Sequence, residues 1–340
     1  MIRCGECGVP RVFSYTTRWT DEGVILSMPR GLIRLLFMER EHMVAVFRAI
    51  EEKLGLPIDH IITEAKRKDA WTYVQDVLPP LVSNLVKKRF VRRLAYLAMI
   101  KQAATIGLGK AKLLEYREGQ LLVGKISPVY YHALFAGDAL GAFETFEGRR
   151  AELSYAFLSS EMFLRIEASE GAHVSERLEL REAPTVKAQA DFQRCPRCGS
   201  PSELAHFRWD AENGKIVDRR TGEWFFVQGT RALDAVLREL EFELGEEIPH
   251  LVAEATWKFF RRQREEHPGV FEDLAFLKIR GMGVPDKPRP SAGDLRNGLD
   301  IRNGYHGAML AGMVAAACGV EKPSWEWESP APGVIRVRLW

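Results

Sequence analysis

The sequence predicts an α+β protein in which one module of helices and antiparallel strands is used twice. The motif C-x-x-C-G-x-P occurs at residues 4–10 and again at residues 195–201. The stretch that follows each motif repeats at an offset of about 190 residues, and each half ends in two apparent strands. Helices and antiparallel strands that occupy separate stretches of the chain are typical of the α+β class.

The composition is that of an ordinary globular protein. Of the 340 residues, 46% are hydrophobic and 28% are charged, and this length allows two domains with their own cores. The net charge is +2, so no overall field favours nucleic acid. No apolar run is long enough for a membrane span, and the first residues lack the apolar segment of a signal peptide. We therefore expect a cytoplasmic protein.

The two C-x-x-C motifs contain four of the five cysteines. Two cysteines in a tight turn, followed by glycine, form a knuckle that directs two thiolates at one metal ion. Because a closed structural zinc site needs four ligands, we predict one zinc ion held by both knuckles. Its ligands would be Cys4, Cys7, Cys195 and Cys198. A redox-active iron site, metal-free thiols and local disulfides are the alternatives.

Each knuckle is followed by a short stretch of strand and turn, residues 11–28 in the first half, and then by a long helix. The apolar stripe of residues 41–54 recurs at an offset of 190, with Met43, Phe47 and Leu54 matching Leu233, Leu237 and Leu244. Gly55 and Gly245 stand where the two helices would stop. We therefore predict that residues 4–168 and 195–340 superimpose.

The two halves differ most in their middle parts. Residues 81–104 predict a basic amphipathic helix, whose charges at Lys87, Lys88, Arg92 and Arg93 we expect to be mainly solvated. Such a helix is also compatible with nucleic-acid binding, although we consider it unlikely in a chain of this charge. The second half instead has an Arg- and Pro-rich stretch, residues 257–290, that reads as helix and then loop.

Both halves close with a helix of small residues, 133–143 and 307–319, and a terminal hairpin. The predicted domains are thus residues 1–168 and 195–340, joined by a polar linker, residues 169–194. The element order in residues 126–168 and 299–339 resembles that of 4-vinyl-reductase-type small-molecule-binding domains. The resemblance covers about half the chain and implies that helices and an antiparallel sheet enclose an apolar ligand site. Many such domains carry a cysteine cluster near their end, where this sequence has only Cys318.

Small residues that face large ones favour an enclosed apolar cavity in at least one half, although tight packing is the alternative. The predicted ligand-binding residues are Phe47, Tyr131, His132, Phe135, Phe163, Tyr305, His306, Trp325 and Trp327. Asp138 lies in the first small-residue helix, where the second half has Gly312 or Met313, and is interpreted as a solvated carboxylate.

A second metal site is conceivable at His60, Glu64, His250 and Glu254. In each half the histidine and the glutamate are four residues apart, which places both side chains on one face of a helix. Facing copies could hold a transition metal. The alternative is that each histidine makes a local hydrogen bond.

The function predicted from these features is non-catalytic binding of a small, mostly apolar molecule by a zinc-containing sensor, carrier or accessory protein. A metalloenzyme or redox protein that uses the His/Glu set or the cysteines is one alternative, and a zinc-knuckle nucleic-acid adaptor is another. The sequence contains no Walker-type phosphate loop and no Gly-x-Ser-x-Gly elbow. Residues that differ between the halves are where a function of one half would lie.

Overall fold

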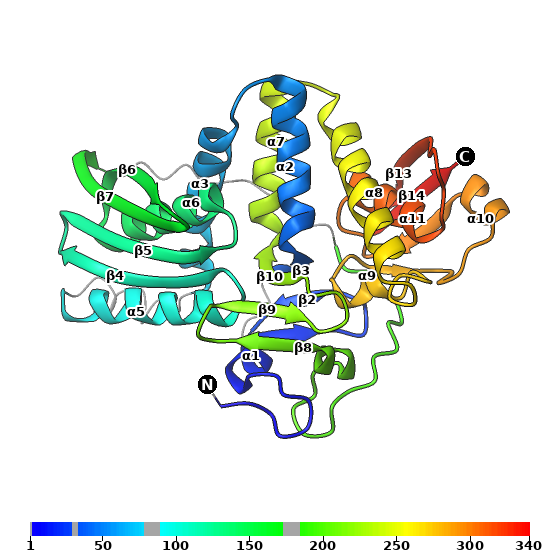
Figure 1. Ribbon diagram of the computed structural model, residues 1–340, viewed down its shortest axis with the longest axis horizontal. Coiled ribbons are helices and arrows are strands. Elements are labelled where there is room, and N and C mark those ends of the chain that lie inside the picture. Colours follow the sequence, from blue (N-terminus) through cyan, green and yellow to red (C-terminus); the bar gives the residue numbers. More distant parts are fainter. Residues whose placement is uncertain (1, 29–32, 78–88, 173–183) are drawn as a thin grey trace.

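The computed structural model describes residues 2–28, 33–77, 89–172 and 184–340, and it has the predicted α+β architecture. In this part of the chain a central six-stranded sheet carries two long helices, and a smaller lobe with its own four-stranded sheet lies on either side (Figure 1). All strand pairs in the three sheets are antiparallel.

The central sheet is built by both halves of the chain, in the order β1-β2-β3-β10-β9-β8. The first half contributes β1 (Thr17–Trp19), β2 (Ile25–Ser27) and β3 (Arg34–Glu39); the second contributes β8 (Phe207–Asp210), β9 (Lys215–Asp218) and β10 (Trp224–Gly229). Strands β3 and β10 pair in the middle, from Phe225 opposite Glu39 to Gly229 opposite Leu35. The sheet therefore has the same connectivity from either edge.

A long helix follows each of the two middle strands. Helix α2 (Arg40–Leu54) buries the predicted stripe that includes Met43 and Phe47, and it ends at Gly55, whose φ of 66° is left-handed. Helix α7 (Thr230–Leu244) buries the matching stripe with Leu233 and Leu237. Both predicted helices are confirmed, because apolar periodicity is a local signal that tertiary packing here reinforces.

The two lobes share one order of elements. The first contains α3 (Asp59–Val77), α5 (Arg89–Thr105), β4 (Gly109–Arg117), β5 (Leu121–Val129), α6 (His132–Glu147), β6 (Arg149–Leu158) and β7 (Glu161–Ala172), with sheet order β4-β5-β7-β6. The second contains α8 (Ile248–Glu266), α9 (Phe276–Ile279), β11 (Val284–Pro285), α10 (Ala292–Asn297), β12 (Leu299–Arg302), α11 (Gly307–Ala317), β13 (Trp325–Ala331) and β14 (Val334–Leu339), with sheet order β11-β12-β14-β13. This correspondence agrees with the predicted duplication, and the superposition of the halves stays a prediction.

The small-residue helices α6 and α11 lie directly against α3 and α8. A Cβ atom on Gly137 would come within 2.5 Å of Thr63 O, and one on Gly312 would come equally close, 2.5 Å, to Ala253 O. These glycines therefore allow two helix backbones to approach each other in both lobes. Close packing explains at least these small residues.

Each lobe docks on strands contributed by the other half of the chain. In the first lobe, Ile106 O accepts a hydrogen bond from Val227 N–H of β10 at 2.8 Å. In the second lobe, Arg280 O accepts one from Phe37 N–H of β3 at 3.1 Å. The long helices also pack against the lobe of the other half: α2 of the first half packs on α8, and α7 of the second half packs on α3. The predicted domains, residues 1–168 and 195–340, are therefore interleaved in the fold.

Part of the predicted linker is also held in place. Within residues 184–194, Val186 N–H donates to Asn303 Oδ1 and Ala190 N–H donates to Asp21 O, each at 2.8 Å. These contacts join the segment to the second lobe and to the turn between β1 and β2. Residues 173–183 lie outside the described residues.

Two local expectations need correction. Residues 11–16 form helix α1 (Arg11–Thr16) rather than strand, after Pro10, whose φ of −58° suits the entry to a helix. Arg92 is not solvated, because the fold brings two distant carboxylates to it: it pairs with Glu147 at 2.6 Å and with Glu118 at 3.3 Å. Arg93 is exposed as predicted, and Lys87 and Lys88 lie outside the described residues.

We predict that residues 1–172 and 184–340, produced as two separate chains, associate into one folded complex. Each half alone would expose the central edge of β3 or β10 and leave its lobe without the strands on which it docks. Co-purification through a tag on one half, followed by circular dichroism, measures this. Two halves that are each folded and monomeric would contradict the interleaved fold.

A pair of glycine variants tests the docking contact itself. A Cβ atom on Gly214 would come within 2.1 Å of Gly109 O, whereas one on Gly222 would meet no atom within 4 Å. Both glycines have positive φ, 63° and 75°. Both alanine variants carry the strain of a side chain at positive φ, but only Gly214→Ala also creates a clash with the other chain. Gly214→Ala should therefore weaken association of the two chains much more than Gly222→Ala.

Candidate functional site

The two cysteine knuckles are built by the same backbone hydrogen bonds. In the first, Cys4 N–H donates to Val9 O at 2.8 Å and Gly8 N–H donates to Cys4 O at 3.0 Å. In the second, Gly199 N–H donates to Cys195 O at 2.9 Å. Gly8 and Gly199 have φ of 74° and 72°, a conformation that glycine adopts without strain. The repeated spacing of the motif thus reflects one tight turn made twice.

The fold brings all four predicted cysteines together. The Sγ atoms of Cys4 and Cys195 lie 3.8 Å apart, those of Cys7 and Cys198 lie 3.4 Å apart, and all four lie within 4.8 Å of one another. A tetrahedral ion with Zn–S bonds of about 2.3 Å requires sulfurs about 3.8 Å apart. The arrangement fits such an ion, and the predicted meeting of residues 191 apart is confirmed.

The surroundings of the cluster favour metal ligation by thiolate. Backbone N–H groups of Cys7 and Glu6 lower the pKa of Cys4 to about 6, which favours its thiolate form. Burial raises the pKa of Cys7, so the thiolate of Cys7 needs a nearby positive charge such as a metal ion. The cluster is part of an aromatic core that includes Phe13, Trp19 and Trp209 from the two halves.

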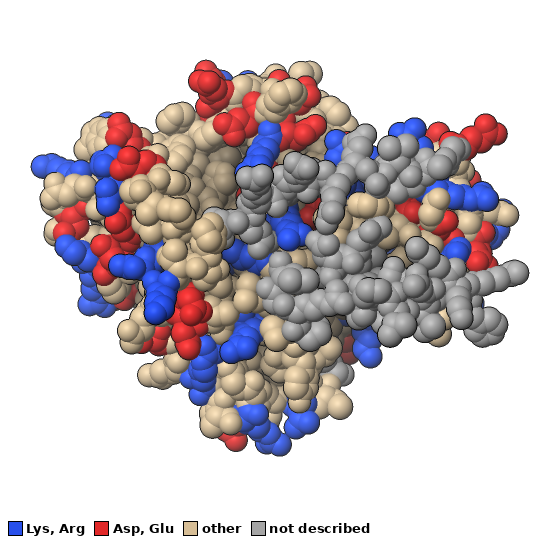
Figure 2. All heavy atoms as spheres, turned by 180° about the vertical axis from the view of Figure 1, so that it is seen from behind, with Lys and Arg blue, Asp and Glu red and all other residues tan. Residues whose placement is uncertain are grey.

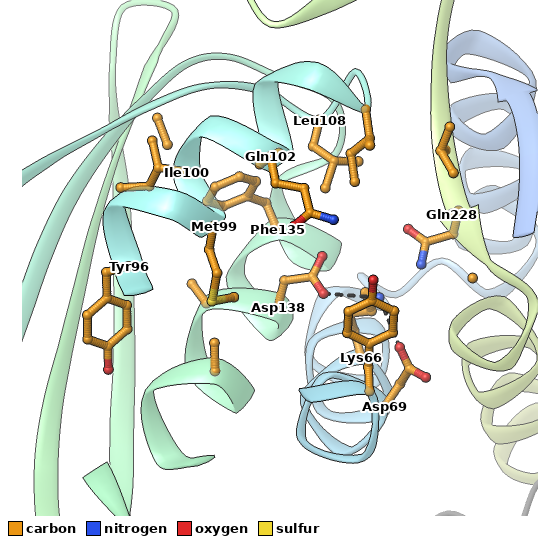
Figure 3. Close-up of a pocket in the computed structure, with 18 of the residues that line it drawn as sticks. Lys66, Asp69, Tyr96, Met99, Ile100, Gln102, Leu108, Phe135, Asp138 and Gln228 are labelled. Carbon is orange, nitrogen blue, oxygen red and sulfur yellow. Dashed lines mark hydrogen bonds and ion pairs between the residues drawn. The ribbon is translucent and has the colours of Figure 1, made fainter. Parts of the chain in front are cut away.

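A second feature is a cavity of about 350 Å³ where the first lobe meets the central sheet. Helices α3, α5 and α6 and strands β4, β5 and β7 form the lobe side, and strands β1, β2, β3 and β10 of the central sheet form the other side. Apolar side chains of α5 and α6, among them Met99, Ile100 and Phe135, line one part of it (Figure 3). The predicted small-residue helix contributes Ala139 and Ala142.

One wall of the cavity is charged. Lys66 Nζ lies 3.0 Å from Asp69 Oδ2 and 3.0 Å from Asp138 Oδ1, and the Lys66 side chain is only 6% exposed (Figure 3). Burial alone would lower the pKa of Lys66, but the two carboxylates raise it above its ordinary value. The two ion pairs therefore favour the charged form of Lys66. Burial raises the pKa of Asp138, and the ammonium group of Lys66 opposes this rise.

Neutral polar groups lie behind this wall, at Tyr130, and in it, at Gln102 and Gln228. Tyr130 is fully buried, and its hydroxyl lies 3.4 Å from Asp138 Oδ2 and 3.5 Å from Gln228 Oε1. Burial raises the pKa of Tyr130 well above its ordinary value, so the phenol stays protonated. The amides of Gln102 and Gln228 lie at the cavity near Asp138 (Figure 3). An apolar space with a few placed polar groups has the general make-up of a small-molecule site.

Of the predicted ligand-binding residues in the first half, Phe135 lines this cavity. Phe47 and Tyr131 pack on each other in the core instead, with ring centroids 5.0 Å apart. Phe163 points to the opposite face of β7 from Leu164, which does line the cavity, because side chains alternate along a strand. Phe163 therefore does not line this cavity, and its role in ligand binding stays a prediction.

His132 lies in a separate surface cleft. Its Nε2 is 2.7 Å from Asp59 Oδ2, and the Tyr155 hydroxyl donates to the same oxygen at 3.3 Å. These contacts join the start of α3 to the start of α6 and to β6. Asp138, interpreted as solvated, is instead ion-paired, and its exposed surface faces the cavity.

The predicted ligand-binding residues of the second half make packing contacts. His306 Nδ1 accepts a hydrogen bond from Met309 N–H at the start of α11, and burial lowers the pKa of His306 to about 4. A Cβ atom on Gly307 would lie 2.3 Å from the Trp327 ring. Tyr305 packs against the main core, and so does Trp325. Neither the first-lobe cavity nor the cleft at His132 is lined by these four side chains.

The fold does not assemble the proposed His/Glu metal set. Helices α3 and α8, which carry the two copies, belong to different lobes (Figure 1). Glu64 pairs with Arg67 and Glu254 pairs with Lys258, at 2.7 Å in the latter. Among the described residues, the four cysteines are the one group of three or more metal-ligating side chains close enough to share an ion.

Lys66 and Asp69 were missed by sequence reasoning, although a signal was present. At the offset of 190, Lys66 and Asp69 match Thr256 and Phe259, so the second half lacks both charges. Divergence between two copies was expected to mark a function of one half. The signal was too weak alone, because charged residues on an isolated helix are more often solvated.

No family model matches the sequence, and neither the curated proteins nor the solved structures provide a match. The resemblance to 4-vinyl-reductase-type domains therefore stays a prediction. None of the described helices is long and apolar enough to cross a membrane.

We predict that Lys66→Met destabilises the protein by about 3 kcal/mol or more near neutral pH, because it leaves buried carboxylates without their cation. Burial already raises the pKa of Asp138 in the folded state, and without the opposing ammonium group of Lys66 it would rise further. The variant should therefore be closest to wild type below the unfolded pKa and lose stability as the pH rises through the folded pKa. Urea unfolding at about pH 3.5, below the unfolded pKa of an aspartate, and at about pH 8 measures this difference.

Lys101→Met is the matched control, because Lys101 is an exposed lysine on α5. It should unfold like wild type at both pH values. A Lys66→Met variant with the pH profile of this control would show that the ion pairs of Lys66 do not stabilise the fold.

Proposed function

We propose that this protein binds a small, mostly apolar molecule in the first-lobe cavity, as a sensor, carrier or accessory protein. The single observation that carries the proposal is the cavity itself. Its volume of about 350 Å³ lies within the range of small-molecule sites, and apolar groups form most of its wall. The buried polar groups at Lys66, Asp138 and Gln228 would orient the ligand. The same expectation follows from the resemblance to 4-vinyl-reductase-type domains.

We also propose that the cysteine cluster holds one structural zinc ion. Four cysteine ligands leave no open coordination position for a substrate, as in other structural zinc sites. The cluster joins the N-terminal knuckle to the knuckle of the second half, so a bound ion would act as a cross-link between residues distant in sequence. Zinc here would stabilise the fold that forms the cavity.

The two alternative functions have less support. A metalloenzyme would need an open metal site, and the His/Glu residues proposed for it belong to different lobes. A nucleic-acid adaptor would need free cations on the basic helix, and Arg92 is already neutralised by Glu147 and Glu118. The described part of that helix therefore offers less positive charge than its sequence suggests.

Filling the cavity should remove binding. We predict that Ala139→Phe, which places a ring in the cavity, abolishes the fluorescence increase of the neutral apolar probe N-phenyl-1-naphthylamine. Ala98→Phe on the exposed side of α5 is the control and should bind the probe like wild type. If both variants fold and bind equally, the ligand does not occupy this cavity.

Removing one cysteine should destabilise the whole protein. We predict one zinc ion per chain by elemental mass spectrometry, and for Cys195→Ser a loss of zinc and of stability on the order of several kcal/mol. Cys318→Ser is the control, because Cys318 lies in the second lobe outside the cluster. Wild-type protein that carries iron, or that keeps its melting temperature after complete metal removal, would overturn the structural zinc site.

A further inference from the structure

The second lobe fills the position that corresponds to the cavity with a cation of its own. In the first lobe, Ile106 lines the cavity, and its carbonyl accepts a hydrogen bond from Val227 N–H. In the second lobe, the carbonyl of Arg280 accepts the matching bond from Phe37 N–H, and Phe37 and Val227 are 190 residues apart. At the same offset, Gly229 of the cavity wall matches Glu39. Under the predicted superposition of the halves, Arg280 and Glu39 occupy the place in the second lobe that Ile106 and Gly229 border in the first.

Arg280 shows which kind of group this position can enclose. Its side chain is 2% exposed, and its Nε donates to Glu39 Oε1 at 3.0 Å. Four aromatic rings surround the guanidinium carbon at 5.0–5.7 Å, those of Phe225, Phe260, Phe271 and Phe276. Aromatic faces and a carboxylate together stabilise a buried cation. In this lobe the protein supplies that cation itself.

The charged cluster at the wall of the first-lobe cavity has two carboxylates and one cation. Two carboxylates, Asp69 and Asp138, share the single buried ammonium of Lys66, which leaves one negative charge in excess when both are ionised. Two further cations line the space: Lys112 is exposed, and Arg231 already has an interaction of its own. An excess charge at an apolar wall interacts strongly with a ligand because little water screens it.

We propose that the cavity takes an amphipathic molecule whose apolar body lies against α5 and α6 and whose cationic head, such as a protonated amine, lies beside Asp138. This inference rests on the proposed function. Figure 3 shows the Asp138 carboxylate at the cavity, with the amides of Gln102 and Gln228 nearby as hydrogen-bond partners for the head. A carboxylate head would instead add a third negative charge to a buried cluster that holds one cation.

Three probes with the same chain separate the head group from the apolar body: octylammonium, octan-1-ol and octanoate, titrated at pH 7 by calorimetry below their micelle concentrations. We expect octylammonium to bind at least about tenfold more tightly than octanoate, because like charges in a desolvated site are strongly disfavoured. Octan-1-ol should bind with intermediate affinity. Octanoate binding as tightly as octylammonium would overturn the cationic-head inference, while octan-1-ol binding would still support the apolar site.

Two matched variants assign the preference to the cavity. Asp138→Asn removes the excess charge and should reduce the affinity ratio of octylammonium to octanoate by about tenfold. Asp286→Asn makes the same chemical change at an exposed position of the second lobe and should leave the ratio unchanged. An unchanged ratio in folded Asp138→Asn would overturn the inference. If none of the three probes binds wild-type protein, the proposed function itself fails, and this inference fails with it.

Discussion

The pairing of β3 with β10 is the interaction on which the rest of the structure depends. It joins strands from the two halves into one continuous sheet, with Phe37 opposite Val227 near its centre. Each long helix leaves from one of these strands, and each lobe docks on the strand of the other half. Neither half can therefore complete its own core. The cysteine cluster links the halves at a second place, through Cys4 and Cys195, so that sheet and cluster hold them in one arrangement.

The two lobes differ in what occupies the space between their helices and the central sheet. Both must fill the space between a helix pair and the central sheet. In the second lobe Arg280 and its aromatic neighbours fill it, and the buried guanidinium is neutralised by Glu39. In the first lobe the space is retained as a cavity, with Lys66 and Asp138 at its wall. A buried ion pair without an enclosing core is a costly arrangement for stability alone. A ligand bound as proposed would give this ion pair a role besides packing.

The cysteine cluster and the cavity differ in how far apart in the sequence their residues lie. A cysteine knuckle is a turn of a few residues whose geometry the motif itself specifies, so the four thiolates could be assigned before the fold was known. The cavity wall is assembled from segments far apart in the chain: Lys66 on α3, Asp138 on α6 and Gln228 on β10. Which of these side chains meet depends on how the lobe sits on the sheet, and no spacing in the sequence encodes that distance.

The sequence by itself determined the local features: the α+β class, the knuckles, the stripes of α2 and α7 and the glycine at Gly55, because each depends on periodicity or on the conformation of a few residues. Only the tertiary structure decided the exchange of lobes between the halves, because strand pairing across the chain leaves no local signal. It also decided which face of β7 borders the cavity and placed Leu164 there. Sequence reasoning took Asp138 for a solvated carboxylate, and the fold makes it the ion-pair partner of buried Lys66, since charge pairing across distant segments is a property of the assembled fold.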